Sequence, residues 1–127
     1  MKDIENNALF WQKLDTLLLS STIKINRPKG EHHPEYPALI FPVNYGVLKD
    51  TSGTGTQEID IFVGSQKIEK VQAIAVSTDI LRKNIEVKLV VGCSNEEVID
   101  ILEYLNSVEF QKAVLIHRGD NVPEWSE

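Results

Sequence analysis

Apolar residues recur at spacings of three and four along the first twenty residues of the chain. This period is that of an amphipathic helix, and it predicts one over residues 4–20. Phe10, Trp11 and Leu14 belong to the apolar side, and Asp15 falls on the side that is expected to face solvent. The apolar side is therefore expected to make core or dimer contacts.

Apolar and polar residues alternate in several later segments, a period that is typical of half-buried strands. Strands are predicted at residues 22–26, 71–77, 85–91 and 113–116. Residues 37–63 are predicted to form a strand, a polar turn that contains glycine, and a second strand.

A second helix is predicted to begin at Ser94, because Ser94 and Glu97 have the spacing of a capping box before an apolar run that ends near Asn106. Residues 27–37 contain three prolines and a glycine, so they are predicted to form a loop. The two adjacent histidines at positions 32 and 33 of this loop are expected to be solvated and not to bind a metal.

Five or six short strands with few long crossovers predict a mainly β chain with two helices, which is an α+β protein. A curled antiparallel sheet that forms a small OB-type barrel is the expected architecture, and a flat α+β sandwich is the alternative. No repeat or linker marks a boundary, so residues 1–127 are expected to be a single domain. It would comprise the helix at 4–20, a barrel at 22–118 and a flexible tail at 119–127.

The chain of 127 residues carries a formal charge of -6, which weighs against nucleic acid because its binders need a basic face. No apolar run approaches the roughly 20 residues of a membrane span, and no signal peptide is apparent, so a cytoplasmic protein is expected. The single cysteine, Cys93, fits that compartment and is interpreted as a buried structural thiol.

Asp60 lies between Ile59 and Ile61 in a predicted strand, so it shares a face with Phe62. A carboxylate in the middle of an apolar strand either faces solvent or holds a cation. Glu86 and Lys88 likewise share one face of a predicted strand. That pair is either an ion-pair stripe on the surface or part of a site. The turn at residues 53–56 is interpreted as a plain turn and not as a phosphate-binding loop.

Residues 41–46, Phe-Pro-Val-Asn-Tyr-Gly, resemble the Tyr-Pro-x-Asn-Tyr-Gly signature of soluble family I inorganic pyrophosphatases. Residues 54–63 are similar to the Asp-Gly-Asp-Pro-x-Asp turn and strand that follow in that family. Residues 23–30 and 86–89 resemble two further strands of the family. The likeness covers residues 22–91 and is closest to a small bacterial branch with an N-terminal Phe-Trp helix and an Arg-Pro-Lys-Gly loop.

The resemblance implies an OB-type pyrophosphatase-like fold and a site where magnesium ions neutralise phosphate and hold the attacking hydroxide. Asp60 corresponds to the aspartate that bridges metals, which makes it the candidate catalytic residue. The implied metal ligands are Asp60, Asp79 and Glu86. The implied substrate-binding residues are Lys88, Tyr45, Arg27 and Lys29.

Neutral residues stand where the family has carboxylates: Thr54, Thr56 and Asn26. The Tyr-Lys pair of the family's late helix should fall at Leu105 and Asn106, so Tyr104 is displaced by one position. Two functions follow from this mixed set. One is magnesium-dependent hydrolysis of pyrophosphate, weakened or lost. The other is a non-catalytic module that binds a phosphorylated small molecule or a protein partner. Neither needs nucleic acid or a membrane, and a homo-oligomer is left open.

Overall fold

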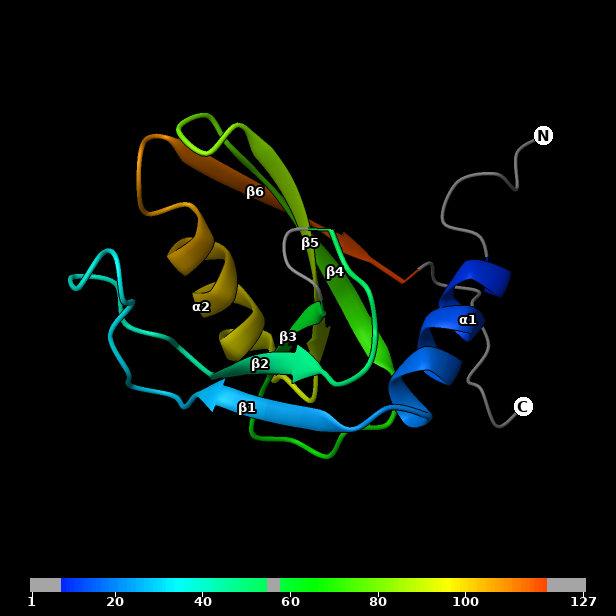
Figure 1. The fold of residues 1–127 in the computed structure, drawn as a ribbon. Coiled ribbons are helices and arrows are strands. Elements are labelled where there is room, and N and C mark those ends of the chain that lie inside the picture. The colour runs from blue at the N-terminus through cyan, green and yellow to red at the C-terminus, as the bar shows by residue number, and fades with distance from the viewer. Residues whose placement is uncertain (1–7, 55–57, 119–127) are drawn as a thin grey trace.

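The computed structural model describes residues 8–54 and 58–118. Within these ranges it contains two helices and six strands, as Figure 1 shows. In chain order they are α1 (Ala8–Leu19), β1 (Ile23–Arg27), β2 (Asn44–Leu48), β3 (Ile59–Val63), β4 (Val71–Asp79), β5 (Asn84–Val91), α2 (Asn95–Leu105) and β6 (Gln111–His117). The predicted class, mainly β with two helices, is confirmed.

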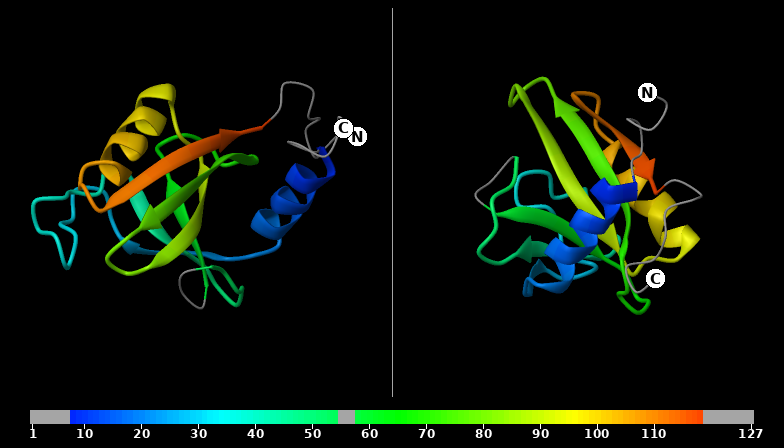
Figure 2. Two further views of the ribbon diagram at one scale, coloured as in Figure 1. Left: turned by 90° about the horizontal axis from the view of Figure 1, so that it is seen from above. Right: turned by 90° about the vertical axis from the view of Figure 1, so that its right-hand side faces the viewer.

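The six strands form one curled sheet in the order β1-β2-β3-β5-β4-β6. All neighbours are antiparallel except β3 and β5, which are parallel. This arrangement is that of a small OB-type barrel. The two helices lie on opposite sides of the sheet, as both views in Figure 2 show. Over the described residues, neither helix is long and apolar enough to cross a bilayer.

The predicted strand at the start of residues 37–63 is shorter than expected, because β2 begins only at Asn44. Before it, the chain folds back on itself: Gly30 N–H donates to Phe41 C=O, and Phe41 N–H donates to the Glu31 carbonyl, each at 2.9 Å. Pro42 has no N–H to offer a ladder, which explains why the strand starts after it. Residues 28–42 therefore form a folded loop beside the sheet.

Gly46, in the middle of β2, lies opposite Ile25 of β1. A Cβ atom added to Gly46 would collide with the carbonyl of Lys24, so the close approach of β1 and β2 depends on a residue without a side chain. Its neighbour Tyr45 lies opposite Phe62 of β3.

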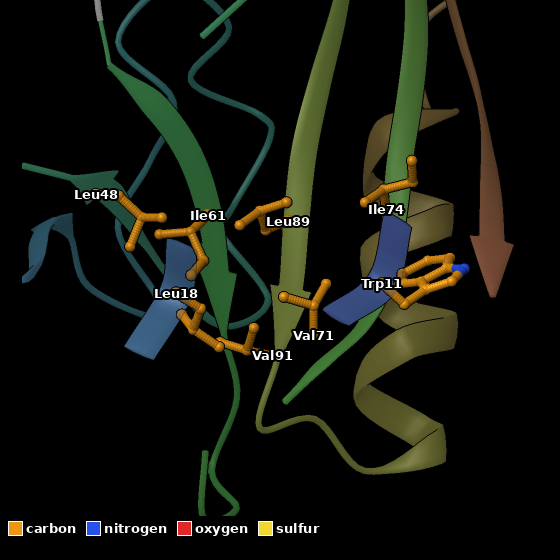
Figure 3. Close-up of a cluster of buried hydrophobic side chains, with 8 residues drawn as sticks. All are labelled: Trp11, Leu18, Leu48, Ile61, Val71, Ile74, Leu89 and Val91. Atoms are coloured by element: carbon orange, nitrogen blue, oxygen red, sulfur yellow. The ribbon is translucent and has the colours of Figure 1, made fainter. Parts of the chain in front are cut away.

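One face of the sheet packs against α1. The buried cluster there, drawn in Figure 3, joins two helix residues to apolar residues of β2, β3, β4 and β5. It consists of Trp11, Leu18, Leu48, Ile61, Val71, Ile74, Leu89 and Val91. Trp11 is 1% exposed, whereas Phe10 is 48% exposed, so only one of the two aromatic residues belongs to the core.

The opposite face packs against α2, whose capping box at Ser94 and Glu97 is confirmed. Phe62, Val90, Ile101 and Leu105 form part of the second buried cluster on this side. Cys93 also belongs to it and is buried, as predicted, and its burial raises the pKa of the thiol to about 12. Because Asp60 precedes Phe62 by two positions on β3, it faces this second side.

Asp15 was expected to face solvent, and this prediction is wrong: its side chain is fully buried. It follows Trp11 by four residues and precedes Leu18 by three, so it lies on the buried stripe of α1. Both carboxylate oxygens accept bonds from the Arg118 guanidinium, at 2.9 and 3.0 Å, and Oδ1 also accepts Val71 N–H at 3.0 Å. Arg118 in turn donates to Val71 C=O at 2.9 Å. We call this group of Asp15, Arg118 and the Val71 backbone the clamp.

Candidate functional site

A cleft of about 790 Å³ lies on the face of the sheet that carries α2. Its lining includes most of the residues that the sequence singled out, although they come from five different strands. These are Tyr45, Asp60, Asp79, Glu86, Lys88, Arg27 and Asn26. Tertiary structure therefore brings the candidates together, as a site requires.

The parallel pairing of β3 with β5 places Asp60 directly opposite Lys88. Lys88 Nζ donates to Asp60 Oδ2 at 3.3 Å, to Glu86 Oε1 at 2.7 Å and to Tyr45 Oη at 2.9 Å. Asp60 is 7% exposed and Lys88 8% exposed, so this is a buried group and not a surface stripe. We call Tyr45, Asp60, Glu86 and Lys88 the cleft floor. Asp60 is therefore not solvated, and its partner in this structure is the Lys88 ammonium. Its role as a metal ligand stays a prediction.

The electrostatics of the cleft floor follow from burial and from the surrounding charges. Burial raises the pKa of Asp60 above its usual value, and the nearby Lys88 opposes that rise only in part. Burial alone would lower the pKa of Lys88, but Tyr45, Asp60 and Glu86 together outweigh it and raise that pKa. Burial raises the pKa of Tyr45 to about 12. At neutral pH the floor thus contains one firmly protonated ammonium and a neutral phenol.

Asp79 and Glu86 lie at the end of the β4–β5 hairpin. Asp79 is buried, and its Oδ1 accepts the backbone N–H groups of Leu81 and Arg82, both at 2.9 Å. Glu86 Oε2 receives a weak bond from Asn84 at 3.4 Å. The loop of Asp79 is therefore fixed by its own carboxylate.

Two predicted residues fall elsewhere, and a third lies outside the described residues. Lys29 is exposed and lines a separate pocket near Ser94, not the cleft. Thr54 does not line the cleft, and its hydroxyl accepts Val87 N–H at 2.8 Å, which ties the turn to β5. Thr56 lies outside the part of the chain that the structure describes.

Aromatic rings form one wall of the cleft, a feature that sequence reasoning missed. Phe41 stacks on Tyr45 with ring centroids 5.2 Å apart and lies at the same distance from the ring of Tyr104. Tyr36 contacts Phe110 at 5.3 Å. These rings come from the loop at 28–42, from β2, from α2 and from the segment after α2. The sequence had singled out Phe41, Tyr45 and Tyr104 one by one, but no local pattern links them to one another or to Tyr36 and Phe110.

His33 was expected to be solvated, but its ring is half-buried and stacks on Phe41 with centroids 6.0 Å apart. Its Nδ1 accepts the backbone N–H groups of Glu35 at 3.0 Å and Tyr36 at 3.2 Å. Burial lowers the pKa of His33, and the positive charges of Arg82, Arg27 and Lys88 lower it further. The imidazole is therefore neutral at pH 7 and shapes the rim of the cleft.

The donor set can be tested for its fit to magnesium. Mg²⁺ requires near-octahedral oxygen ligation, usually with carboxylates. Over residues 8–54 and 58–118, no three acidic, histidine or cysteine side chains are grouped so that they could hold a metal ion. Asp60 and Glu86 share the ammonium of Lys88. In this arrangement the residues do not fit a magnesium centre.

Neither the models of known protein families nor the curated protein sequences give a match to this chain. Among solved structures, the crystal structure of an inorganic pyrophosphatase from Neisseria gonorrhoeae is similar, with a TM-score of 0.60. The alignment covers 76% of this chain and 81% of that one, at 13% sequence identity. At this identity the likeness shows a pyrophosphatase-like fold.

Proposed function

We propose that this chain is a module that binds a small molecule on a pyrophosphatase-like fold and does not carry out magnesium-dependent hydrolysis. The observation that carries the proposal is the cleft floor. There the Lys88 ammonium lies between Asp60 and Glu86, at 3.3 and 2.7 Å, and acts as their shared counter-ion. The cleft of about 790 Å³ above it is large enough for a small ligand.

The chemistry of the neutral positions supports the same conclusion. Hydrolysis of a phosphoanhydride by metal ions needs carboxylates that hold the metals and orient a hydroxide. Asn26 lines the cleft without a charge, and the Thr54 hydroxyl is engaged by the backbone of β5. Loss of supporting groups around a metal typically costs about 10 to 100-fold in affinity or activity.

Weak pyrophosphate hydrolysis is the second candidate. It is favoured by one observation: Asp60, Asp79, Glu86 and Lys88 all line the same cleft as Tyr45. Magnesium would have to enter with the substrate, since the described residues do not group three metal ligands. Lys88, Tyr45 and Arg27 would be the phosphate contacts of that candidate.

Phosphate release from pyrophosphate at millimolar magnesium tests both candidates. The wild type is expected to show no turnover above background, and the Thr54→Asp/Thr56→Asp variant is expected to gain it if the missing carboxylates are the cause. An aspartate at position 54 keeps an acceptor for Val87 N–H. Ser52→Asp adds a charge at an exposed position of the same turn and is the matched control. Turnover by the wild type would overturn the proposal.

Several earlier expectations stay predictions. They are a phosphorylated ligand or a protein partner, the absence of nucleic-acid binding, a homo-oligomer, a single domain and a cytoplasmic location. A phosphorylated ligand meets a specific obstacle, because the cleft contains more carboxylates than basic groups. Such a ligand would therefore need cations of its own.

A further inference from the structure

The cleft has an excess of negative charge. Its lining contains five carboxylates and three basic side chains, which leaves a formal charge of -2 with His33 neutral. The carboxylates are those of Glu35, Glu58, Asp60, Asp79 and Glu86, and the basic groups are those of Arg27, Arg82 and Lys88. Arg82 is already engaged in an ion pair with Glu35. Apart from that pair, Arg27 and Lys88 stand against four carboxylates of the lining, and Lys88 is bonded to two of them, Asp60 and Glu86.

The aromatic wall is a second and independent feature of the same cleft. It consists of five rings that line the cleft: Phe41, Tyr45, Tyr104, Tyr36 and Phe110. The ring centroid of Phe41 lies 5.2 Å from those of Tyr45 and Tyr104, and the Tyr36 and Phe110 centroids lie 5.3 Å apart. The faces of such rings carry partial negative charge, so they attract cations and repel anions. Wall and floor thus select for the same sign of charge.

The cleft already binds one ammonium group, that of Lys88, through carboxylates and an aromatic ring. Lys88 Nζ is bonded to two carboxylates and to Tyr45 Oη, and it lies 5.3 Å from the centroid of the Tyr45 ring. One ammonium balances one carboxylate, so a negative charge is left over beside it. Asp79 adds a second negative charge, because its Oδ1 accepts neutral backbone amides, those of Leu81 and Arg82.

We propose that this cleft binds a small organic cation, namely a primary ammonium compound with an apolar or aromatic body. The ammonium would lie near Asp79 and Glu86, and the body would lie against the rings of Phe41 and Tyr104. This assignment rests on the proposed function, because it gives the binding module its class of ligand. A free phosphate or pyrophosphate anion would be repelled by the same groups.

Three compounds of similar shape and different charge test the assignment: 2-phenylethylammonium, 2-phenylethanol and 3-phenylpropionate. Binding to the full chain at pH 7 is measured by calorimetry and by shifts of backbone amide resonances. The ammonium is expected to bind at least about tenfold more tightly than the alcohol, and the carboxylate is expected not to bind. Shifts are expected at Asp60, Lys88 and Tyr104. Equal binding of the ammonium and the alcohol, or shifts confined to other faces, would overturn the assignment.

Charge removal inside the cleft gives the second arm. Asp79→Asn keeps an oxygen that can accept the N–H groups of Leu81 and Arg82, and Glu86→Gln keeps an acceptor for Lys88. Each is expected to weaken ammonium binding about five- to tenfold. Glu69→Gln changes the net charge equally at an exposed position outside the cleft and should change affinity less than twofold. If both cleft variants bind as the wild type does, the assignment is wrong.

Pyrophosphate turnover is measured on the same samples, so that the two proposals fail separately. Turnover by the wild type overturns the proposed function, whatever the ammonium does. Absent ammonium binding in a sample without turnover overturns only the ligand class. Circular dichroism of each variant shows whether it is folded. If Asp79→Asn is not folded, the result for Glu86→Gln alone decides the test.

Discussion

The clamp and the cleft floor are both buried groups of charged side chains, and they lie on opposite faces of one sheet. In the clamp, one carboxylate meets one guanidinium through two bonds of 2.9 and 3.0 Å, and the Val71 backbone supplies the remaining partners. In the cleft floor, one ammonium is shared by two carboxylates beside a cavity. The clamp is balanced in charge and the cleft floor is not.

The difference separates a structural role from a binding role. Burial of an ion pair costs little only if both charges are balanced and their hydrogen bonds are made. The clamp meets that condition, and it joins α1 to the end of β6 and the start of β4. The cleft floor leaves negative charge unbalanced next to open space, where a ligand can supply the missing cation. Four substitutions test this contrast.

Arg118→Met is expected to have the largest effect, a loss of about 3–5 kcal/mol in the free energy of unfolding. It leaves the fully buried Asp15 carboxylate without its cation. Urea unfolding measures the loss. Arg27→Met is the control, because the Arg27–Glu31 pair is exposed and 3.9 Å long, so it should change stability by less than about 1 kcal/mol. Similar losses in both variants would show that the clamp is not special.

Lys88→Met is expected to cost about 2–3 kcal/mol at pH 7, less than the loss of Arg118, because the cavity lets water reach the carboxylates that remain. Without the ammonium, the pKa of Asp60 should rise further, since Lys88 is the main group that opposes its rise. The loss should therefore shrink as the pH falls and Asp60 takes up a proton. Urea unfolding at pH 7 and at about pH 5 checks this. A loss that does not change with pH would contradict the account.

Asp60→Asn in the cleft floor should change the free energy of unfolding in the opposite direction to the matched substitution in the clamp. The pKa of Asp60 is raised in the fold, so its contribution to stability is full below its unfolded pKa and is lost as the pH rises through the folded value. Asparagine does not ionise, so the variant avoids the destabilisation that the charged Asp60 causes at pH 7. Its free energy of unfolding at pH 7 is expected to equal that of the wild type or to exceed it by up to about 1 kcal/mol. Glu86 still accepts a bond from Lys88.

Asp15→Asn is the matched substitution in the clamp. It is expected to cost at least about 2 kcal/mol, because it leaves the Arg118 guanidinium without a carboxylate. Unfolding curves of the two variants from about pH 4 to pH 8 provide the comparison. If both variants lose the same stability, the difference in charge balance between the clamp and the cleft floor has no energetic meaning.

The sequence was sufficient for most of the strands, the capping box and the face on which Asp60 lies, because each depends on a local pattern. It did not locate the start of β2, which begins only after Pro42. It was also sufficient to pair Glu86 with Lys88, which are two positions apart on one strand. The fold class followed from the number and shortness of the strands. These features require no knowledge of which segments meet in space.

Contacts between distant segments could not be predicted in this way. The parallel register that sets Asp60 opposite Lys88 depends on the crossover from β3 to β5, and the aromatic wall joins Phe41 to Tyr104, 63 positions later in the printed sequence. Asp15 was misplaced because its polarity outweighed its position, although it follows Trp11 by four residues. A spacing test applied without regard to residue type would have placed it on the buried stripe.

The smallest expected effect concerns His33 at the rim of the cleft. Its pKa is lowered in the fold, so its contribution to stability is present above the unfolded pKa and is lost as the pH falls through the folded value. Protonation of Nδ1 would break the bonds from the N–H groups of Glu35 and Tyr36. His33→Asn keeps an acceptor for these amides and does not titrate, so its melting temperature should fall less between pH 7 and about pH 5 than that of the wild type.

His32→Asn is the control for this measurement, because it replaces the neighbouring histidine, whose ring contacts the Pro37 carbonyl and not the N–H groups of Glu35 and Tyr36. That variant should follow the pH dependence of the wild type. If His33→Asn does so as well, protonation at the rim does not contribute. If instead the melting temperature depends less on pH only in His33→Asn, the stability of the cleft face responds to pH through its rim as well as its floor. The clamp, which contains no histidine, offers no such group.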